Sequence, residues 1–161
     1  MRTVAFAFAL AAALAPAAAF VALRAGPAAR HSARRASAAD VASLPGDPSL
    51  VLTTSVDLGD KKLEVMKALS KAIVEVTGKP ESYVAVCVND NASVIWAGDE
   101  APCALGIMYS IGAVDQENNG DMTRLFTDIL EPFGIEENRI YIQFFDMPRS
   151  MVGWSRRTFA G

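Results

Sequence analysis

The sequence predicts an α/β fold of the α+β type, in which two β-α-β units form one four-stranded mixed sheet with two helices on one face. Two observations support this prediction. The order strand, helix, glycine, strand occurs twice within residues 50–145. In both copies a new strand begins five residues after the glycine that ends the helix, at Gly78 and at Gly134. The repeated order indicates a duplicated unit within one domain.

The first unit opens with an apolar, β-branched run at residues 50–56, which is typical of a strand. Asp57 or Asp60 can cap the helix that follows. Apolar side chains then recur at three- and four-residue steps, so we expect one helix face to pack on a sheet. Gly78 suits the left-handed end of a helix, and Pro80 cannot continue it. The apolar positions of this helix are Leu63, Met66, Leu69, Ile73 and Val76.

A second strand completes the first unit at residues 83–88. The Asn-Asp-Asn sequence at residues 89–91 predicts a turn. A short strand is expected to return at residues 93–96.

The second unit begins with an apolar strand at residues 104–111. A helix is expected from about residue 119 to residue 133, where Gly134 ends it. Residues 140–145 form the last predicted strand. The residues expected to face the core from the second helix are Met122, Leu125, Phe126, Ile129 and Leu130.

This architecture leaves one face of the sheet without helices. The predicted strands are apolar on both faces, and residues 83–88 hardly alternate between apolar and polar side chains. An apolar sheet face left in water costs roughly 25 cal/mol per Å², which disfavours a domain of this size that stays single. The sequence therefore predicts a closed homo-oligomer in which the open faces meet.

The first 47 residues differ in composition from the rest of the chain. Arg2 is followed by an apolar run at residues 4–14 and by an Ala-Ala-Ala cleavage site at residues 17–19. This is the pattern of a signal peptide over about residues 1–19. The following segment is rich in Ala, Arg and Ser and has no acidic residue before Asp40.

We therefore expect a targeting region at residues 1–47 and a folded domain at residues 48–161. A signal peptide takes a chain into the secretory pathway. A signal peptide with an Arg- and Ser-rich, acid-poor extension resembles the bipartite presequences of complex plastids. Secretion and a plastid destination both remain open from the sequence.

Charge and composition exclude several classes of partner. Residues 1–47 carry a net charge of about +3 and the remainder about −6, counted from the charged side chains. An acidic body disfavours binding to a nucleic-acid backbone. The single histidine, His31, lies in the leader, and Cys87 and Cys103 lack metal-ligand spacing. We therefore expect no nucleic acid, no metal and no cofactor.

Pro48 lies at the boundary between the leader and the domain. Inside a chain, a proline nitrogen is an amide without a hydrogen and is not basic. At the first position of a chain it is a free secondary amine, which can act as a base near neutral pH. Cleavage of the Asp47–Pro48 bond therefore decides which chemistry Pro48 can perform.

Eight short blocks after the leader carry a family resemblance. Their order and spacing match those of the macrophage migration inhibitory factor family, in the tautomerase superfamily, with one apparent single-residue deletion near Gly134. The resemblance covers nearly all of the chain after the leader. The blocks are TGKP at residues 77–80, YVAV at 83–86, PCAL at 102–105, SIG at 110–112, NRIYI at 138–142, FDM at 145–147, VGW at 152–154 and TFA at 158–160.

The resemblance implies an activity and an assembly. Counted back from residue 77 without a gap, the family's catalytic N-terminal proline falls on Pro48. The family forms trimers with an active site at each subunit interface. Its keto–enol tautomerase activity acts on phenylpyruvate, hydroxyphenylpyruvate and dopachrome. The implied substrate is therefore a small aromatic 2-oxo acid or a related carbonyl compound, converted without a cofactor by an intramolecular isomerisation.

The resemblance also assigns the residues of the substrate pocket. Lys79 holds the substrate carboxylate and lowers the pKa of Pro48, and the backbone N–H of Ile111 is a further donor. Tyr141 comes from the adjacent subunit, and Gln143 stands where the family commonly has an Asn in the pocket. Apolar walls and ring stacking come from four further residues, namely Tyr83, Val152, Trp154 and Phe159.

Simpler roles remain open for several of these residues. Pro48 can be an ordinary loop proline, and Lys79 can contact carbonyl groups at a helix C-terminus. Tyr141, Trp154 and Phe159 can serve packing alone. The whole protein can also be a cytokine-like signalling or binding protein of the same fold with a vestigial pocket. The sequence does not name the physiological substrate or the site at which the leader is cut.

Overall fold

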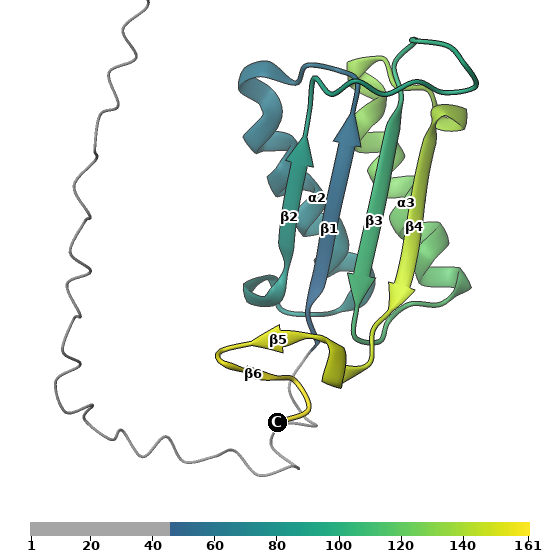
Figure 1. Ribbon diagram of the computed structural model, residues 1–161. Coiled ribbons are helices and arrows are strands. Elements are labelled where there is room, and N and C mark those ends of the chain that lie inside the picture. The colour runs from purple at the N-terminus through teal and green to yellow at the C-terminus, as the bar shows by residue number, and fades with distance from the viewer. Residues whose placement is uncertain (1–45) are drawn as a thin grey trace, which may run out of the picture. The chain divides into compact units, whose positions relative to one another are not determined.

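A computed structural model describes residues 46–161 of the chain (Figure 1). The predicted signal peptide and the Arg- and Ser-rich segment lie outside the described residues, apart from Gly46 and Asp47. Within residues 46–161, no helix has the length and apolar character needed to cross a membrane.

The structure contains the predicted four-stranded mixed sheet. Its strands are β1 (Pro48–Thr54), β2 (Ala85–Asn89), β3 (Ala104–Ser110) and β4 (Ile140–Asp146), in the spatial order β2-β1-β3-β4. β1 pairs parallel with β2 and antiparallel with β3, and β3 pairs parallel with β4. The two β-α-β units thus meet at the antiparallel β1–β3 pair.

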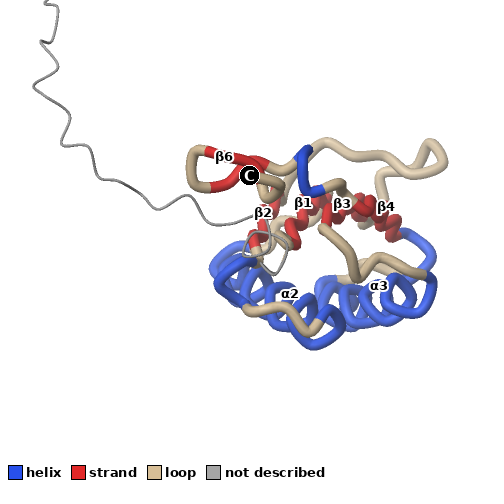
Figure 2. Tube along the Cα trace, turned by 90° about the horizontal axis from the view of Figure 1, so that it is seen from below, coloured by secondary structure: helices blue, strands red, loops and turns tan. Residues whose placement is uncertain are grey.

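Both long helices cover the same face of the sheet, as predicted (Figure 2). They are α2 (Lys62–Thr77) and α3 (Gln116–Leu130). Their buried side chains pack against the inward-facing residues of the strands to form one hydrophobic core. The fully buried members include Leu50, Leu52, Leu69, Ile73, Met108, Met122, Phe126 and Leu130.

Glycine ends both helical segments as the sequence predicts. Gly78 has φ 65° and its N–H donates to the carbonyl of Val74, and Gly134 has φ 80°. The helix starts differ from the prediction. A 3-10 turn (Gly59–Lys61) precedes α2, and the carboxylate of Asp57 accepts from the N–H of Gly59 at 2.8 Å instead of capping α2. α3 starts three residues earlier than expected because Asp115 caps it, accepting from an N–H in its first turn at 2.9 Å.

The predicted returning strand at residues 93–96 is wrong. That part of the chain is a loop with one isolated bridge between Trp96 and Asp99. The strand order explains the difference, because the chain must cross the end of β1 to travel from β2 to β3. At that crossing, the N–H of Ala92 donates to the carbonyl of Thr54 at 3.0 Å, so the loop closes the end of β1 and cannot pair along β2.

A small hairpin follows β4 and lies at the end of the sheet where β1 begins (Figure 1). Its strands are β5 (Gly153–Trp154) and β6 (Arg157–Thr158). The N–H of Phe159 donates to the carbonyl of Val152 at 3.0 Å and returns the chain toward the sheet. The remaining short helices are 3-10 turns at Glu81–Tyr83, Glu131–Phe133, Glu137–Arg139 and Arg149–Met151.

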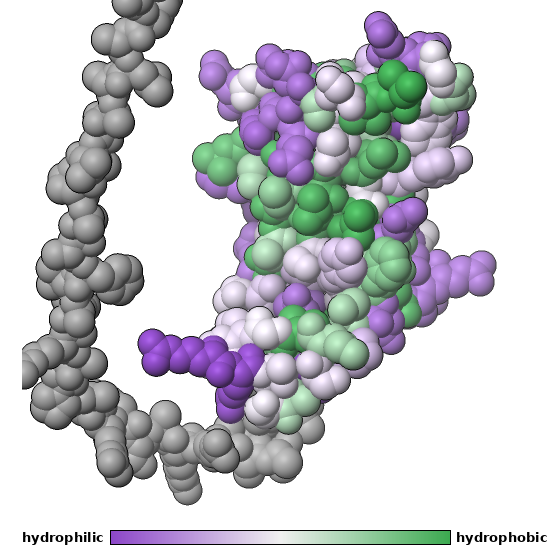
Figure 3. Space-filling view, in the orientation of Figure 1, coloured by the Kyte–Doolittle hydropathy of each residue, from purple (hydrophilic) through white to green (hydrophobic). Residues whose placement is uncertain are grey.

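The sheet face opposite the helices is exposed and apolar. Figure 3 views this face, with the strands in front of the helices as in Figure 1, and a hydrophobic patch lies across its centre. Its large apolar side chains are Val51 (39% exposed), Leu105 (42%), Tyr141 (64%) and Phe145 (44%). Apolar patches of this kind mark interaction surfaces in soluble proteins.

Candidate active site

Pro48 is the first residue of the central strand β1, and its side chain is fully buried. It pairs with Ser110 at the end of β3, which in turn pairs with Asp146 at the end of β4. The start of β1, the start of β2 and the ends of β3 and β4 therefore lie at one end of the sheet. We call this end of the sheet the Pro48 edge. Most of the predicted site residues are brought together here, whereas Tyr141 and Gln143 are not.

Lys79 reaches this edge from the end of α2. Because Gly78 turns the chain in the left-handed conformation, Lys79 leaves the helix and points to the end of β3. Its Nζ donates to Ser110 Oγ at 2.7 Å, to the carbonyl of Ile111 at 2.7 Å and to the carbonyl of Gly112 at 3.2 Å. The ammonium group is thus held by the β3 end and not by carbonyls of its own helix.

The charge state of Lys79 reflects this position. Burial lowers the pKa of Lys79, and the positive charge of Arg149 lowers it further. The carboxylates of Asp47 and Asp146 oppose this shift. Lys79 is therefore a partly desolvated cation beside the first residue of β1, which is where a substrate carboxylate would gain most from it.

The two residues before Pro48 occupy the space beside Ile111. The N–H of Ile111 donates to the carbonyl of Asp47 at 3.3 Å. Gly46 packs so closely that an added Cβ would lie 2.3 Å from Ile111 Cβ. In the uncut chain the predicted substrate donor is therefore taken by the chain itself, and the nitrogen of Pro48 is an amide.

The side chain of Asp47 lies in a partly buried position at the same edge. Its Oδ1 atom is buried without a hydrogen-bond partner in the described structure. Burial raises the pKa of Asp47, and the charge of Lys79 opposes that rise.

Three predicted aromatic residues form one cluster at this edge. The ring of Tyr83 lies 5.9 Å from that of Trp154 and 6.3 Å from that of Phe159, and the Trp154 and Phe159 rings stack at 5.6 Å. Phe159 is fully buried, whereas Trp154 is 45% exposed. The carbonyl of Val152 accepts a hydrogen bond from the N–H of Phe159, which joins Val152 to this cluster. Trp154 is therefore the aromatic ring of this set most open to a ligand.

Tyr141 and Gln143 do not reach Pro48 within one chain. Tyr141 pairs with Leu105, which pairs with Thr53 near the far end of β1. Five residues along a strand separate this position from Pro48, which is about 17 Å. Tyr141 instead lies against the ring of Trp96 at a centroid distance of 4.2 Å. Gln143 lies between the two ends on the exposed face and pairs with Ile107.

Three side chains at this edge were not predicted from the sequence to belong to the site. Ser110 accepts from Lys79, Asp47 lies beside Lys79 and Ile111, and Asp146 accepts from the N–H of Gly112 at 2.8 Å. A signal was present for two of them, because Ser110 and Asp146 belong to the SIG and FDM blocks. Only the pairing of β1, β3 and β4 reveals that these blocks meet.

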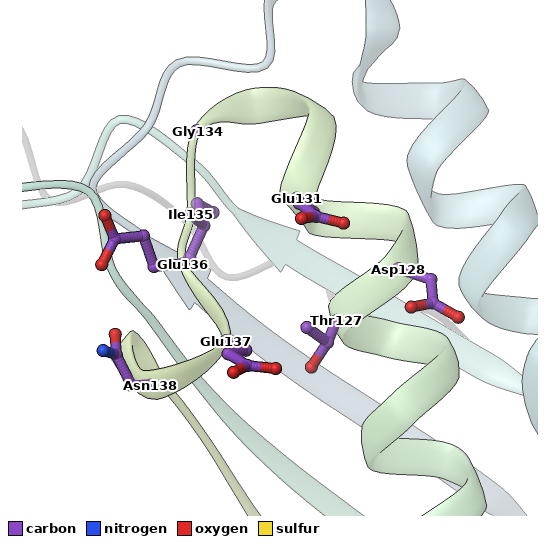
Figure 4. Close-up of a pocket in the computed structure, with 8 residues that line it drawn as sticks. All are labelled: Thr127, Asp128, Glu131, Gly134, Ile135, Glu136, Glu137 and Asn138. Carbon is purple, nitrogen blue, oxygen red and sulfur yellow. The ribbon is translucent and has the colours of Figure 1, made fainter.

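A separate shallow cavity of about 530 Å³ lies on α3 and the segment that follows it (Figure 4). Carboxylates dominate its lining, which consists of Thr127, Asp128, Glu131, Gly134, Ile135, Glu136, Glu137 and Asn138. It contains none of the predicted site residues. Within residues 46–161, no group of His, Cys, Asp and Glu side chains is placed to hold a metal ion.

Comparison with known proteins agrees with this architecture. The family model described as "Macrophage migration inhibitory factor (MIF)" matches residues 48–160. A macrophage migration inhibitory factor homolog of Trichuris trichiura is 37% identical over 113 residues, which are 70% of this chain and 99% of that protein. Macrophage migration inhibitory factor of Meriones unguiculatus is 32% identical over 114 residues, which are 70% of this chain and 99% of that protein.

Solved structures give the same result. A macrophage migration inhibitory factor homologue from Prochlorococcus marinus has a TM-score of 0.66 and 29% identity, covering 69% of this chain and 98% of that one. The macrophage migration inhibitory factor of Trichinella spiralis has a TM-score of 0.64 and 31% identity, covering 68% and 98%. The fold and the family resemblance are both confirmed. The chain belongs to the macrophage migration inhibitory factor family.

Proposed function

We propose that the chain that begins at Pro48 is a keto–enol tautomerase with the Pro48 amine as its general base. The observation that carries this proposal is the burial of Pro48 at the sheet edge where the Lys79 ammonium binds Ser110, the pairing partner of Pro48. Membership of a family in which tautomerase activity is known supports the same reaction.

The position of Pro48 suits the chemistry of a base. A free α-amino group has a reference pKa of about 7.7–8.0. Burial and a neighbouring cation both disfavour its protonated form, so both lower that pKa. An amine that is unprotonated at neutral pH takes the proton next to the substrate carbonyl and returns it to the neighbouring atom.

The proposed substrate is a small aromatic 2-oxo acid such as phenylpyruvate or hydroxyphenylpyruvate, or a dopachrome-like compound. Its carboxylate would be bound by Lys79, which exchanges one of its present acceptors for the substrate. Removal of Gly46 and Asp47 frees the N–H of Ile111 for a substrate oxygen. The aromatic ring would stack beside Tyr83 and Trp154, with Val152 and Phe159 behind them.

Tyr141 and Gln143 join this site only if another subunit supplies them. We propose a homotrimer in which the exposed sheet faces meet and each site lies between two subunits. The apolar residues of that face support the assembly, because a single chain leaves Val51, Leu105 and Phe145 partly in water. The family's assembly is the second support.

The proposal requires that residues 1–47 are removed. We propose that this leader takes the chain into the secretory pathway, toward secretion or a plastid. N-terminal sequencing of the protein from its native source tests both the destination and the cut.

The chain that begins at Pro48 is expected to tautomerise phenylpyruvate or hydroxyphenylpyruvate, measured by the change in ultraviolet absorbance. A chain that keeps Asp47 is expected to be inactive because its Pro48 nitrogen is an amide. As a control, Pro48→Gly should lower kcat/KM by about 10²- to 10⁴-fold while the circular dichroism spectrum stays the same. Equal activity with and without Asp47 would falsify the assignment of the base. Complete inactivity of the folded chain that begins at Pro48 would favour the binding or signalling role.

Lys79→Ala is expected to raise KM for a 2-oxo acid by about 10- to 100-fold, because one charge-assisted hydrogen bond contributes about 1.5–3 kcal/mol. Steady-state kinetics beside a thermal melt separates lost substrate binding from lost stability. Lys67→Ala is the matched control, since Lys67 is exposed on α2. A Lys79→Ala chain with the wild-type KM would remove Lys79 from the carboxylate site.

The chain that begins at Pro48 is expected to sediment as a trimer at micromolar concentration. Val51→Asp places a charge on the apolar sheet face and should give monomers with reduced activity, because Tyr141 and Gln143 then have no neighbouring site. Leu63→Asp is the matched control, since Leu63, which the sequence predicted to face the sheet, is 60% exposed on α2. A wild-type monomer with full activity would contradict the interface site.

A further inference from the structure

The peptide bond between Asp47 and Pro48 is difficult for a protease to reach in the folded chain. A protease binds its substrate as an extended segment on both sides of the bond that it cuts. Residues on the C-terminal side of this bond already form β1, the central strand, which pairs with β2 on one edge and β3 on the other. On the N-terminal side, Gly46 is buried against Ile111.

We propose that the folded chain cleaves its own Asp47–Pro48 bond, with the Asp47 carboxyl as nucleophile and the Ile111 N–H as stabiliser of the carbonyl oxygen. This activity goes beyond the tautomerase reaction. Its product is the free Pro48 amine that the proposed function needs, but the cleavage itself does not depend on that function.

The step balances with water as the only co-reactant. An oxygen of the Asp47 side-chain carboxyl attacks the main-chain carbonyl carbon of the same residue and closes a five-membered ring. The bond from that carbon to the Pro48 nitrogen breaks, and the carboxyl proton passes to the nitrogen, which leaves as a secondary amine. The leader then ends in a cyclic anhydride. One water molecule opens it to two carboxyl groups, so the net reaction is hydrolysis of one peptide bond without oxidation or reduction.

Three features of the structure favour this reaction at this bond. The N–H of Ile111 already donates to the carbonyl oxygen of Asp47 at 3.3 Å, which is the oxygen that becomes negative in the tetrahedral intermediate. Oδ1 of Asp47 is buried and has no hydrogen-bond partner within the described residues. The Lys79 ammonium donates to three protein oxygens of the β3 end, so it does not form a direct pair with the carboxyl.

Gly46 allows the close approach to Ile111 that accompanies the hydrogen bond from the Ile111 N–H to Asp47. A Cβ at this position would lie 2.3 Å from Ile111 Cβ and 2.7 Å from the Ile111 carbonyl oxygen. With any other residue, either this segment or Ile111 must therefore shift, and we expect the hydrogen bond from the N–H of Ile111 to the Asp47 carbonyl to be lost. In the Gly-Asp-Pro sequence, Gly46 thus allows close packing on Ile111, and Asp47 supplies the proposed nucleophile.

The rate should depend on pH through the Asp47 carboxyl. The reactive form is the protonated carboxyl, because the leaving nitrogen takes its proton. Burial raises the pKa of Asp47, so the reactive form persists to a higher pH than in a solvated aspartate. The Lys79 charge opposes this rise, as does a hydrogen bond from the backbone N–H of Asp47, while the charges of Asp146 and Arg149 act on Lys79. The rate is therefore expected to be constant below the pKa of Asp47 and to fall about tenfold per pH unit above it.

The test uses the full chain, purified at about pH 8 with protease inhibitors and then moved to about pH 5, nearer the acid range of a carboxyl group. Intact mass and N-terminal sequencing follow the products with time. Wild type is expected to split into residues 1–47 and a fragment that begins with Pro48. Asp47→Ala should remain whole, and Asp121→Ala, which changes an exposed carboxylate on α3, should split like wild type.

Two comparisons separate a folded-state reaction from the ordinary lability of an Asp–Pro bond. Gly46→Ala and the urea-unfolded wild type should both cleave at least about tenfold more slowly than the folded chain, because both lose the Ile111 donor. Equal rates in folded and unfolded chains, a cut in Asp47→Ala, or no fragment that begins with Pro48 would overturn the proposal. The readout is mass, so it is independent of tautomerase activity, which is tested separately on a chain made to begin at Pro48.

Discussion

The hydrogen bonds of the Lys79 ammonium to the end of β3 are the interaction on which the candidate site depends. They join the glycine stop of α2 to the edge of the sheet where β1 starts. They also keep a cation partly out of water, which costs free energy unless its protons are satisfied. Ser110, Ile111 and Gly112 supply the oxygens that satisfy them. A positive charge is thereby fixed near Pro48, and in the proposed function it would both favour an unprotonated amine and attract a substrate carboxylate.

The strand order sets the second constraint, which is that one chain holds only part of the proposed site. The antiparallel β1–β3 pair places Pro48 at one end of the sheet and Tyr141 at the other. The face between them is apolar and exposed, so the surface that would join subunits also carries Tyr141 and Gln143. Assembly and catalysis are therefore linked in this account. The proposed removal of the leader adds a third link, because Gly46 and Asp47 occupy the place beside Ile111 in the chain that retains them.

Local sequence signals predicted most of the fold, and contacts between distant segments explain what they missed. Gly78 and Gly134 marked the ends of the two helical segments because glycine readily adopts the left-handed conformation that often follows a helical end. The prediction of a strand at residues 93–96 was wrong because these apolar residues lie in the loop that crosses the end of β1, where Trp96 packs on Tyr141. The family register located Pro48, Lys79 and Ile111, whose meeting the structure describes. It gave no sign that Asp47 would lie beside them, because residues before the proline have no counterpart in that register.

The pKa of the Pro48 amine decides whether Pro48 can act as the base. In a chain that begins at Pro48 and carries isotope-labelled proline, only the Pro48 nitrogen is an amine, so an NMR titration reports on it alone. This pKa is expected to lie below the reference range of about 7.7–8.0, because burial and the Lys79 charge both disfavour the protonated form. Lys79→Met should move that pKa upward. A wild-type value within or above the reference range would contradict Pro48 as the base of this site.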